Sequence, residues 1–140
     1  MLDVELVVPD ATGRSMVDEA VDRAGLRRGP SRAARLRHAD IGIVSSWLVP
    51  VRIPGDRAVS IGARGVNLAL LVDGPNLVVR LTTGGTGGHL VNALATWMTG
   101  REVDTTLTVP LTPGARAYVD VPGVGRIGVR VPQPAGVIEG

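Results

Sequence analysis

The fold class is decided by residues 115–131, which read Ala115-Arg116-Ala117-Tyr118-Val119-Asp120-Val121, Pro122-Gly123-Val124-Gly125 and Arg126-Ile127-Gly128-Val129-Arg130-Val131. Apolar and polar residues alternate on both sides of a glycine-containing turn, as in two strands that each bury one face. The residues expected to face the core are Val119, Val121, Ile127, Val129 and Val131. Those expected to face outward are Arg116, Tyr118, Asp120, Arg126 and Arg130. Together with Thr106–Val109 and the turn at 112–114, they predict an antiparallel meander.

Strand patterns also fill the middle and the start of the chain. Leu2, Val4, Leu6 and Val8 alternate with other residues, which predicts a strand with one buried face. Further apolar segments predict strands over Ile41–Leu48, Val49–Ile53, Ala58–Ile61, Val66–Val72 and Leu77–Leu81. Turn sequences rich in Gly, Pro and Asp separate most of these segments.

Two long helices and one short helix are expected. Ser15 is a suitable N-cap for a helix that runs to Ala24 and is followed by Gly25. A short helix is expected from Ser31 to His38, and a second long helix over about 89–99. The prediction is an α+β fold: β-rich, with a mostly antiparallel sheet or small barrel and two main helices. Residues 1–131 are expected to form a single α+β domain, and residues 132–140 an extended C-terminal tail.

Composition excludes several kinds of chemistry. The chain has no Cys, and all 15 basic residues are Arg, so disulfides, thiolate metal sites and lysine Schiff bases are excluded. The two histidines, His38 and His89, lack the spacing of metal ligands, and we expect no metal, no cofactor and no catalytic residue. With no Phe and one Tyr, few side chains can stack on bases.

Charge and hydropathy bear on location. The formal charge is only +2, which implies no general affinity for nucleic acid or membranes. Asp3 and Glu5 stand where a signal peptide has basic residues, and no apolar run approaches the roughly 20 residues of a membrane span. The expected location is the cytoplasm, or an assembly that forms there.

The glycine-rich segment 84–89 is the first candidate site. It follows the strand predicted at Leu77–Leu81 and precedes the second long helix, so its backbone N–H groups would lie at a helix N-terminus that attracts anions. The candidate ligand-binding residues are Gly85, Thr86, Gly87, Gly88 and His89. The alternative is that these glycines only make a tight turn.

This segment resembles a loop of a known enzyme family. Gly84-Gly85-Thr86-Gly87-Gly88-His89, followed by Ala93-Leu94-Ala95, is similar to the first strand-to-helix loop of the lipid II-forming UDP-N-acetylglucosamine transferases. In that family the loop belongs to a much longer two-domain enzyme, and a proline usually occupies the position of Asn92. We interpret the similarity as convergent loop chemistry and do not transfer the activity.

A cluster of arginines is the second candidate site. Six of the 15 Arg lie between Arg23 and Arg37, and no acidic residue lies from Leu26 to His38. The candidate partner-binding residues are Arg27, Arg28, Arg32, Arg35 and Arg37. Arginine is enriched at protein interfaces, which favours a subunit contact over nucleic acid. The alternative is that these arginines lie on a solvated surface and bind no partner.

Three functions follow in order of preference. The first is a non-enzymatic structural subunit of a homo- or hetero-oligomeric assembly, such as a virion, tail or connector component. The second is a small enzyme or sensor that binds a phosphorylated ligand at residues 84–89. The third is a nucleic-acid-binding module that uses the arginines of residues 23–37. Self-association or neighbouring protein subunits are the expected partners.

Overall fold

The computed structural model describes residues 2–63, 65–83, 104–121 and 124–132. The elements of these residues, in chain order, are β1 (Leu2–Val8), α1 (Ala11–Arg23), β2 (Arg27–Arg28), β3 (Arg32–His38), β4 (Gly42–Ile53), β5 (Val59–Ala63), β6 (Val66–Asp73), β7 (Asn76–Thr83), β8 (Asp104–Pro110), β9 (Arg116–Val121) and β10 (Gly125–Arg130). Within this part of the chain, no helix combines the length and the apolar content needed to cross a lipid bilayer.

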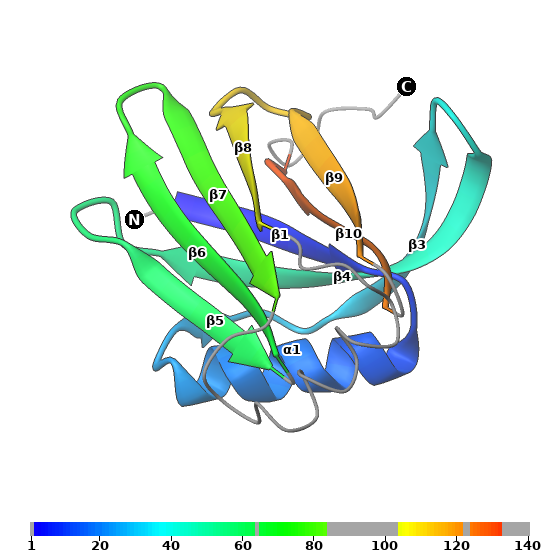
Figure 1. The fold of residues 1–140 in the computed structure, drawn as a ribbon, viewed down its shortest axis with the longest axis horizontal. Helices are drawn as coiled ribbons and strands as arrows, with labels where there is room; N and C mark the ends of the chain where they lie inside the picture. The colour runs from blue at the N-terminus through cyan, green and yellow to red at the C-terminus, as the bar shows by residue number, and fades with distance from the viewer. Residues whose placement is uncertain (1, 64, 84–103, 122–123, 133–140) are drawn as a thin grey trace.

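The strands form two antiparallel sheets. The larger sheet has the order β2-β4-β1-β10-β9, with β3 also paired to β4, and the smaller one has the order β5-β6-β7-β8. The sheets face each other, and α1 lies along one end of the pair (Figure 1). Hairpins join β3 to β4, β6 to β7 and β9 to β10, whereas β1 pairs with strands distant in sequence.

The expectation of two main helices is wrong. The described residues contain one helix and two antiparallel sheets, so the chain is mostly β rather than α+β with two helices. The short helix expected over 31–38 is instead β3, whose residues pair with β4 along their whole length. Pairing overrides local propensity here, because Ala34, Leu36 and His38 alternate toward a covered face. The second long helix, expected over 89–99, lies outside the described residues.

The first helix starts earlier than Ser15. Its N-cap is Asp10, whose side-chain oxygen accepts a hydrogen bond of 2.7 Å from the backbone N–H of Gly13. This bond satisfies a donor that the first turn of a helix leaves free, so the helix begins at Ala11. At the other end, Gly25 adopts a φ of +74°, a conformation that suits glycine after a helix C-terminus.

Residues expected as two strands, 41–48 and 49–53, form the single strand β4. Pro50 lies within it, opposite Glu5 of β1. The carbonyl oxygen of Pro50 accepts a hydrogen bond from the N–H of Gly29, so the edge of Pro50 that lacks a donor faces away from β1. On that edge, Pro50 lies between the part of β4 that pairs with β2 and the part that pairs with β3. No described strand there needs a hydrogen bond from the nitrogen of residue 50, so a proline is tolerated.

The main core lies between the two sheets. Its fully buried residues include Leu6 of β1, Val49 of β4 and Leu70, Leu77 and Leu81 of the smaller sheet.

The expected meander is only partly correct. The β9–β10 hairpin is confirmed, but β8 pairs with β7 in the other sheet. The alternation of apolar and polar residues indicates which side chains of a strand share a face, but it does not determine which other strand pairs with it. The tail expected over 132–140 lies almost entirely outside the described residues.

Truncating Ile127 is expected to destabilise the fold strongly. Its side chain is 7% exposed in the core between the sheets, so Ile127→Ala should lower the free energy of unfolding by about 2–4 kcal/mol. The matched control is Ile41→Ala at a side chain that is 55% exposed, where the change should stay within about 0.5 kcal/mol. Urea denaturation measures both. Equal effects of the two substitutions would contradict this placement of β10.

Candidate functional site

A hairpin arm extends from the larger sheet. We define the arm as residues 32–46, which comprise β3, the turn at 39–41 and the first part of β4. β1 pairs only with residues 47–53 of β4, so the part of β4 within the arm has β3 as its neighbour. Gly42 closes the turn with a φ of +83°, a conformation that other residues rarely adopt. The arm rises beside β9 at one side of the molecule (Figure 1).

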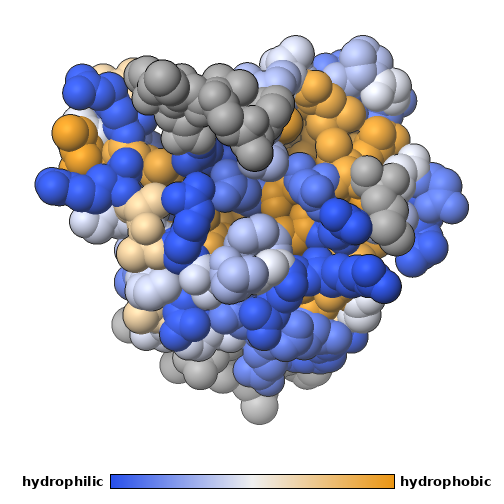
Figure 2. Space-filling view, turned by 180° about the vertical axis from the view of Figure 1, so that it is seen from behind, coloured by the Kyte–Doolittle hydropathy of each residue, from blue (hydrophilic) through white to orange (hydrophobic). Residues whose placement is uncertain are grey.

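The outer face of the arm is exposed and carries both apolar and positively charged side chains. Ile43 is 56% exposed and pairs across the hairpin with Arg37, while Arg35 lies opposite Ser45. Ile41, in the turn, is also more than half exposed. Seen from behind, the lobe formed by the arm shows hydrophobic surface beside strongly hydrophilic surface (Figure 2). This combination is typical of interface cores that contain arginine.

The base of the same face is covered by the protein itself. Trp47 follows Ile43 and Ser45 on this side of β4, and the guanidinium of Arg14 from α1 lies 4.9 Å from the centre of its ring. This cation–π contact covers the aromatic ring. No comparable contact with a described residue covers Ile43, so the exposed apolar surface is confined to the far half of the arm.

The inner face of the arm packs on β9 and β10. The rings of His38 and Tyr118 have centroids 4.5 Å apart, and Leu36 packs with Leu48 and Val7 in a small second core. Gly128, opposite Tyr118 across the β9–β10 pair, provides the space for this ring. A Cβ atom at Gly128 would overlap the Tyr118 ring. Burial raises the pKa of Tyr118.

Arg126 connects the arm to the sheet by charge. Its guanidinium donates hydrogen bonds of 2.7 and 2.6 Å to the two carboxylate oxygens of Asp40, and of 2.8 and 3.1 Å to those of Asp120. These bonds lower the pKa of Asp40 to about 2 and raise the pKa of Arg126. Asp40 belongs to the arm and Asp120 to β9, so one side chain bridges the two elements.

His38 is oriented by the same arginine. Its Nδ1 lies 3.2 Å from a terminal nitrogen of Arg126, and because a guanidinium can only donate, Nδ1 is the acceptor of this hydrogen bond. Nε2 and the Tyr118 hydroxyl are buried and have no hydrogen-bond partner among the described residues. His38 is only 5% exposed and its neighbour Asp40 bonds to Arg126, so the arrangement is that of a packing histidine.

A pair of charged residues is buried under the arm. Glu5 and Arg130 are 6% and 7% exposed and lie opposite each other on β1 and β10. Glu5 Oε2 lies 3.3 Å from Arg32 of β3, and its Oε1 lies 4.0 Å from Arg130 Nε. The expectation that Arg130 faces outward is correct for its direction, but the side chain is buried rather than exposed to solvent. It does lie on the face away from the main core, but the arm covers that face.

The structure separates the arginines of the second candidate site. Arg28 bonds Asp22 at 2.8 Å, and Arg32 bonds Glu5, so both are used within the protein. Arg35 and Arg37 lie on the outer face of the arm. Arg27 lies on β2, opposite Arg52 of β4. Only Arg35 and Arg37 combine with the exposed isoleucines. The sequence signal that could have identified this surface is Ile41 and Ile43 beside Gly42.

The first candidate site cannot be placed in the same way. Gly85, Thr86, Gly87, Gly88 and His89 lie outside the described residues, as does the segment that follows them. The strand expected before them is confirmed as β7, which ends at Thr83. Comparisons with known proteins identify no relative: no family model, no curated protein and no solved structure matches the chain.

The link between Asp40 and Arg126 predicts a dependence of stability on pH. The pKa of Asp40 in the folded state, about 2, lies below its ordinary value of 3.8, so the ionised form stabilises the fold. This contribution is present above pH 3.8 and is lost as the pH falls through about 2. Urea denaturation between pH 2 and pH 7 should therefore show a steeper acid loss for the wild type than for Asp40→Asn. Identical profiles would contradict the link.

Proposed function

We propose that the protein is a non-enzymatic structural subunit that assembles with copies of itself through the outer face of the arm. Examples of such a subunit are the components of a virion, a tail or a connector. Assembly would take place in the cytoplasm or in a particle formed there. Closed homo-oligomers are the commonest assemblies of soluble proteins, which favours a second copy as the partner.

The observation that carries the proposal is the exposure of Ile41 and Ile43 on an extended hairpin. Fully burying one such side chain contributes about 1.5–3 kcal/mol, so two adjacent isoleucines make the far half of the arm a favourable contact surface. Arg35 and Arg37 flank them and have no ion-pair partner within the described part of the chain. At protein interfaces, arginine is common among the few residues that contribute most of the binding free energy, and these residues lie near a well-packed centre.

The rigidity of the arm supports the same function. A flexible hairpin would lose conformational freedom on binding, which weakens association. Here Arg126 and the His38–Tyr118 contact hold the inner face on the sheet before any partner arrives. The outer face is therefore presented in one orientation.

Removing the two isoleucines is expected to abolish self-association. The variant carries Ile41→Ser and Ile43→Ser together, and Leu71→Ser on β6 is the matched control, since Leu71 is also a large exposed apolar residue, at 41%. Sedimentation velocity over a range of protein concentrations should show oligomers for the wild type and for Leu71→Ser, and a monomer for the double variant. A wild type that stays monomeric at every concentration, or equal association of all three proteins, would contradict the proposal.

Reversing the charge of the arm should weaken the same association in a salt-dependent way. Arg35→Glu with Arg37→Glu replaces two cations at the contact, so the loss should be larger at low salt, where charge interactions are less screened. Arg80→Glu on β7, in the smaller sheet, serves as the control, because it reverses the charge of an exposed arginine outside the arm. If the Arg35/Arg37 variant assembles normally but loses binding to duplex DNA, the arm is a nucleic-acid contact instead.

A further inference from the structure

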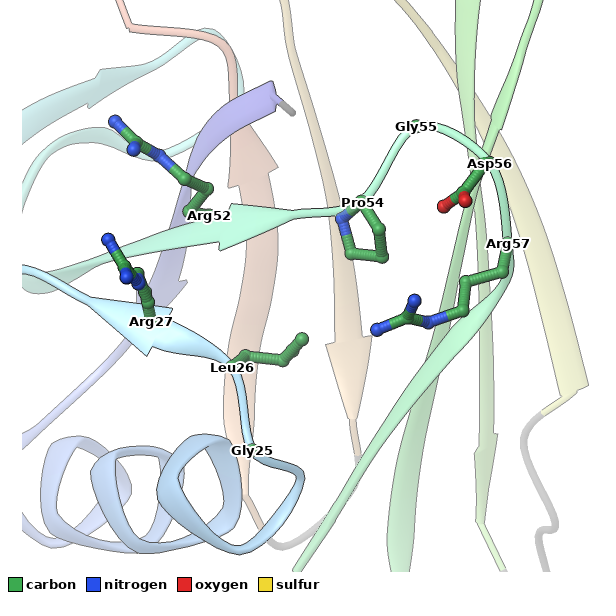
Figure 3. Close-up of a pocket in the computed structure, with 8 residues that line it drawn as sticks. All are labelled: Gly25, Leu26, Arg27, Arg52, Pro54, Gly55, Asp56 and Arg57. Carbon is green, nitrogen blue, oxygen red and sulfur yellow. The ribbon is translucent and has the colours of Figure 1, made fainter.

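A second surface feature lies away from the arm, between β2 and the turn that follows β4. It is a pocket of about 560 Å³, and its lining includes Leu26, Arg27, Arg52, Pro54, Asp56 and Arg57 (Figure 3). Pockets for small ligands have volumes of roughly 300–1,000 Å³. Three of the lining side chains are arginines, and they come from three different segments of the chain.

Two of these arginines are held side by side by the sheet. Arg27 of β2 and Arg52 of β4 are direct cross-strand partners, and both guanidinium groups extend in the same direction, at the end of the pocket away from Pro54, Asp56 and Arg57 (Figure 3). Like charges in this position destabilise a sheet unless an opposite charge lies nearby. Asp3 supplies one, bonding Arg52 Nε at 2.9 Å. Arg27 has no ion-pair partner within the described part of the chain.

The third arginine comes from the turn. Arg57 extends from the segment after Pro54 back toward Leu26, so its guanidinium lies at the apolar wall formed by these two residues (Figure 3). Arg57 likewise has no ion-pair partner among the residues that the structure describes. Asp56 points from the same turn toward Pro54, which places a hydrogen-bond acceptor on the far side of this proline from Arg52 (Figure 3).

We propose that this pocket binds a phosphorylated small molecule. The phosphate would lie on Arg27 and Arg52, because a planar guanidinium offers paired donors that match phosphate oxygens. The body of the ligand would lie along Leu26 and Pro54, with Arg57 as a further donor. Asp56 can accept a hydrogen bond from a hydroxyl group, which favours a hydroxylated compound such as a sugar phosphate.

This site does not depend on the arm. It shares none of the residues of the arm, and it would bind its ligand in a monomer or in an assembled subunit. The residues assigned to this site also differ from those of the glycine-rich candidate site, residues 84–89. Failure of the association experiments would therefore leave this proposal intact, and the reverse also holds.

The test is binding of glucose 6-phosphate and of inorganic phosphate to the full chain, measured by calorimetry, with glucose as the control compound. Both phosphates should bind saturably and glucose should not. Arg27→Gln and Arg57→Gln each remove a charged donor, so affinity for glucose 6-phosphate should fall about tenfold to a hundredfold. Arg35→Gln on the arm removes the same charge elsewhere and should leave the affinity unchanged. Thermal melting establishes that each variant is folded.

Three results would overturn the proposal. The first is the absence of saturable binding of either phosphate at millimolar concentration. The second is an equal loss of affinity in Arg35→Gln, which would show a general effect of charge. The third is binding of a short single-stranded oligonucleotide that requires Arg27 and Arg57 while neither small phosphate binds. That result would assign the pocket to a nucleic-acid backbone.

Discussion

The structure depends on a difference in length between two neighbouring strands. β4 has 12 residues, whereas β1 has seven and pairs only with the last seven residues of β4. Past the end of β1, β4 has a partner among the described strands on one edge only: β3 pairs with residues 42–48 on the edge opposite to β1. The arm follows from this arrangement, and its inner face is held by the His38–Tyr118 contact and by Arg126.

Covering the second face of the larger sheet has an electrostatic consequence. Residues that alternation places opposite the main core are enclosed with Leu36 and Leu48, among them Glu5, His38 and Arg130. Removing charged groups from water is costly, and the cost is offset only when each charge meets an opposite one. Glu5 lies between Arg32 and Arg130, and this pairing permits a region of charged residues to be buried.

The sequence predicts most strands because their pattern is local. The strands β1, β7, β9 and β10 follow period-two alternation, and the turns between hairpins contain the expected Gly and Pro. The helix expected over 31–38 was wrong because arginine and alanine favour helices locally, while the pairing that makes β3 a strand is supplied by β4. Burial of Arg130 was missed for a related reason: alternation shows which way a side chain points, but not what covers it. The Arg126 contacts join Asp40 to a residue 86 positions away, and no local pattern contains that information.

The position of β1 at the centre of the larger sheet also affects how the chain is made. Among the described strands, β1 precedes all others in the chain, and one of its two neighbours, β10, follows all others. A ribosome therefore releases β1 long before its second edge can be satisfied. Until β10 emerges, β1 presents an open row of backbone donors and acceptors, with Leu6 beside them. Completion of the larger sheet therefore waits for β10, and the hairpins of the smaller sheet are available to form before it.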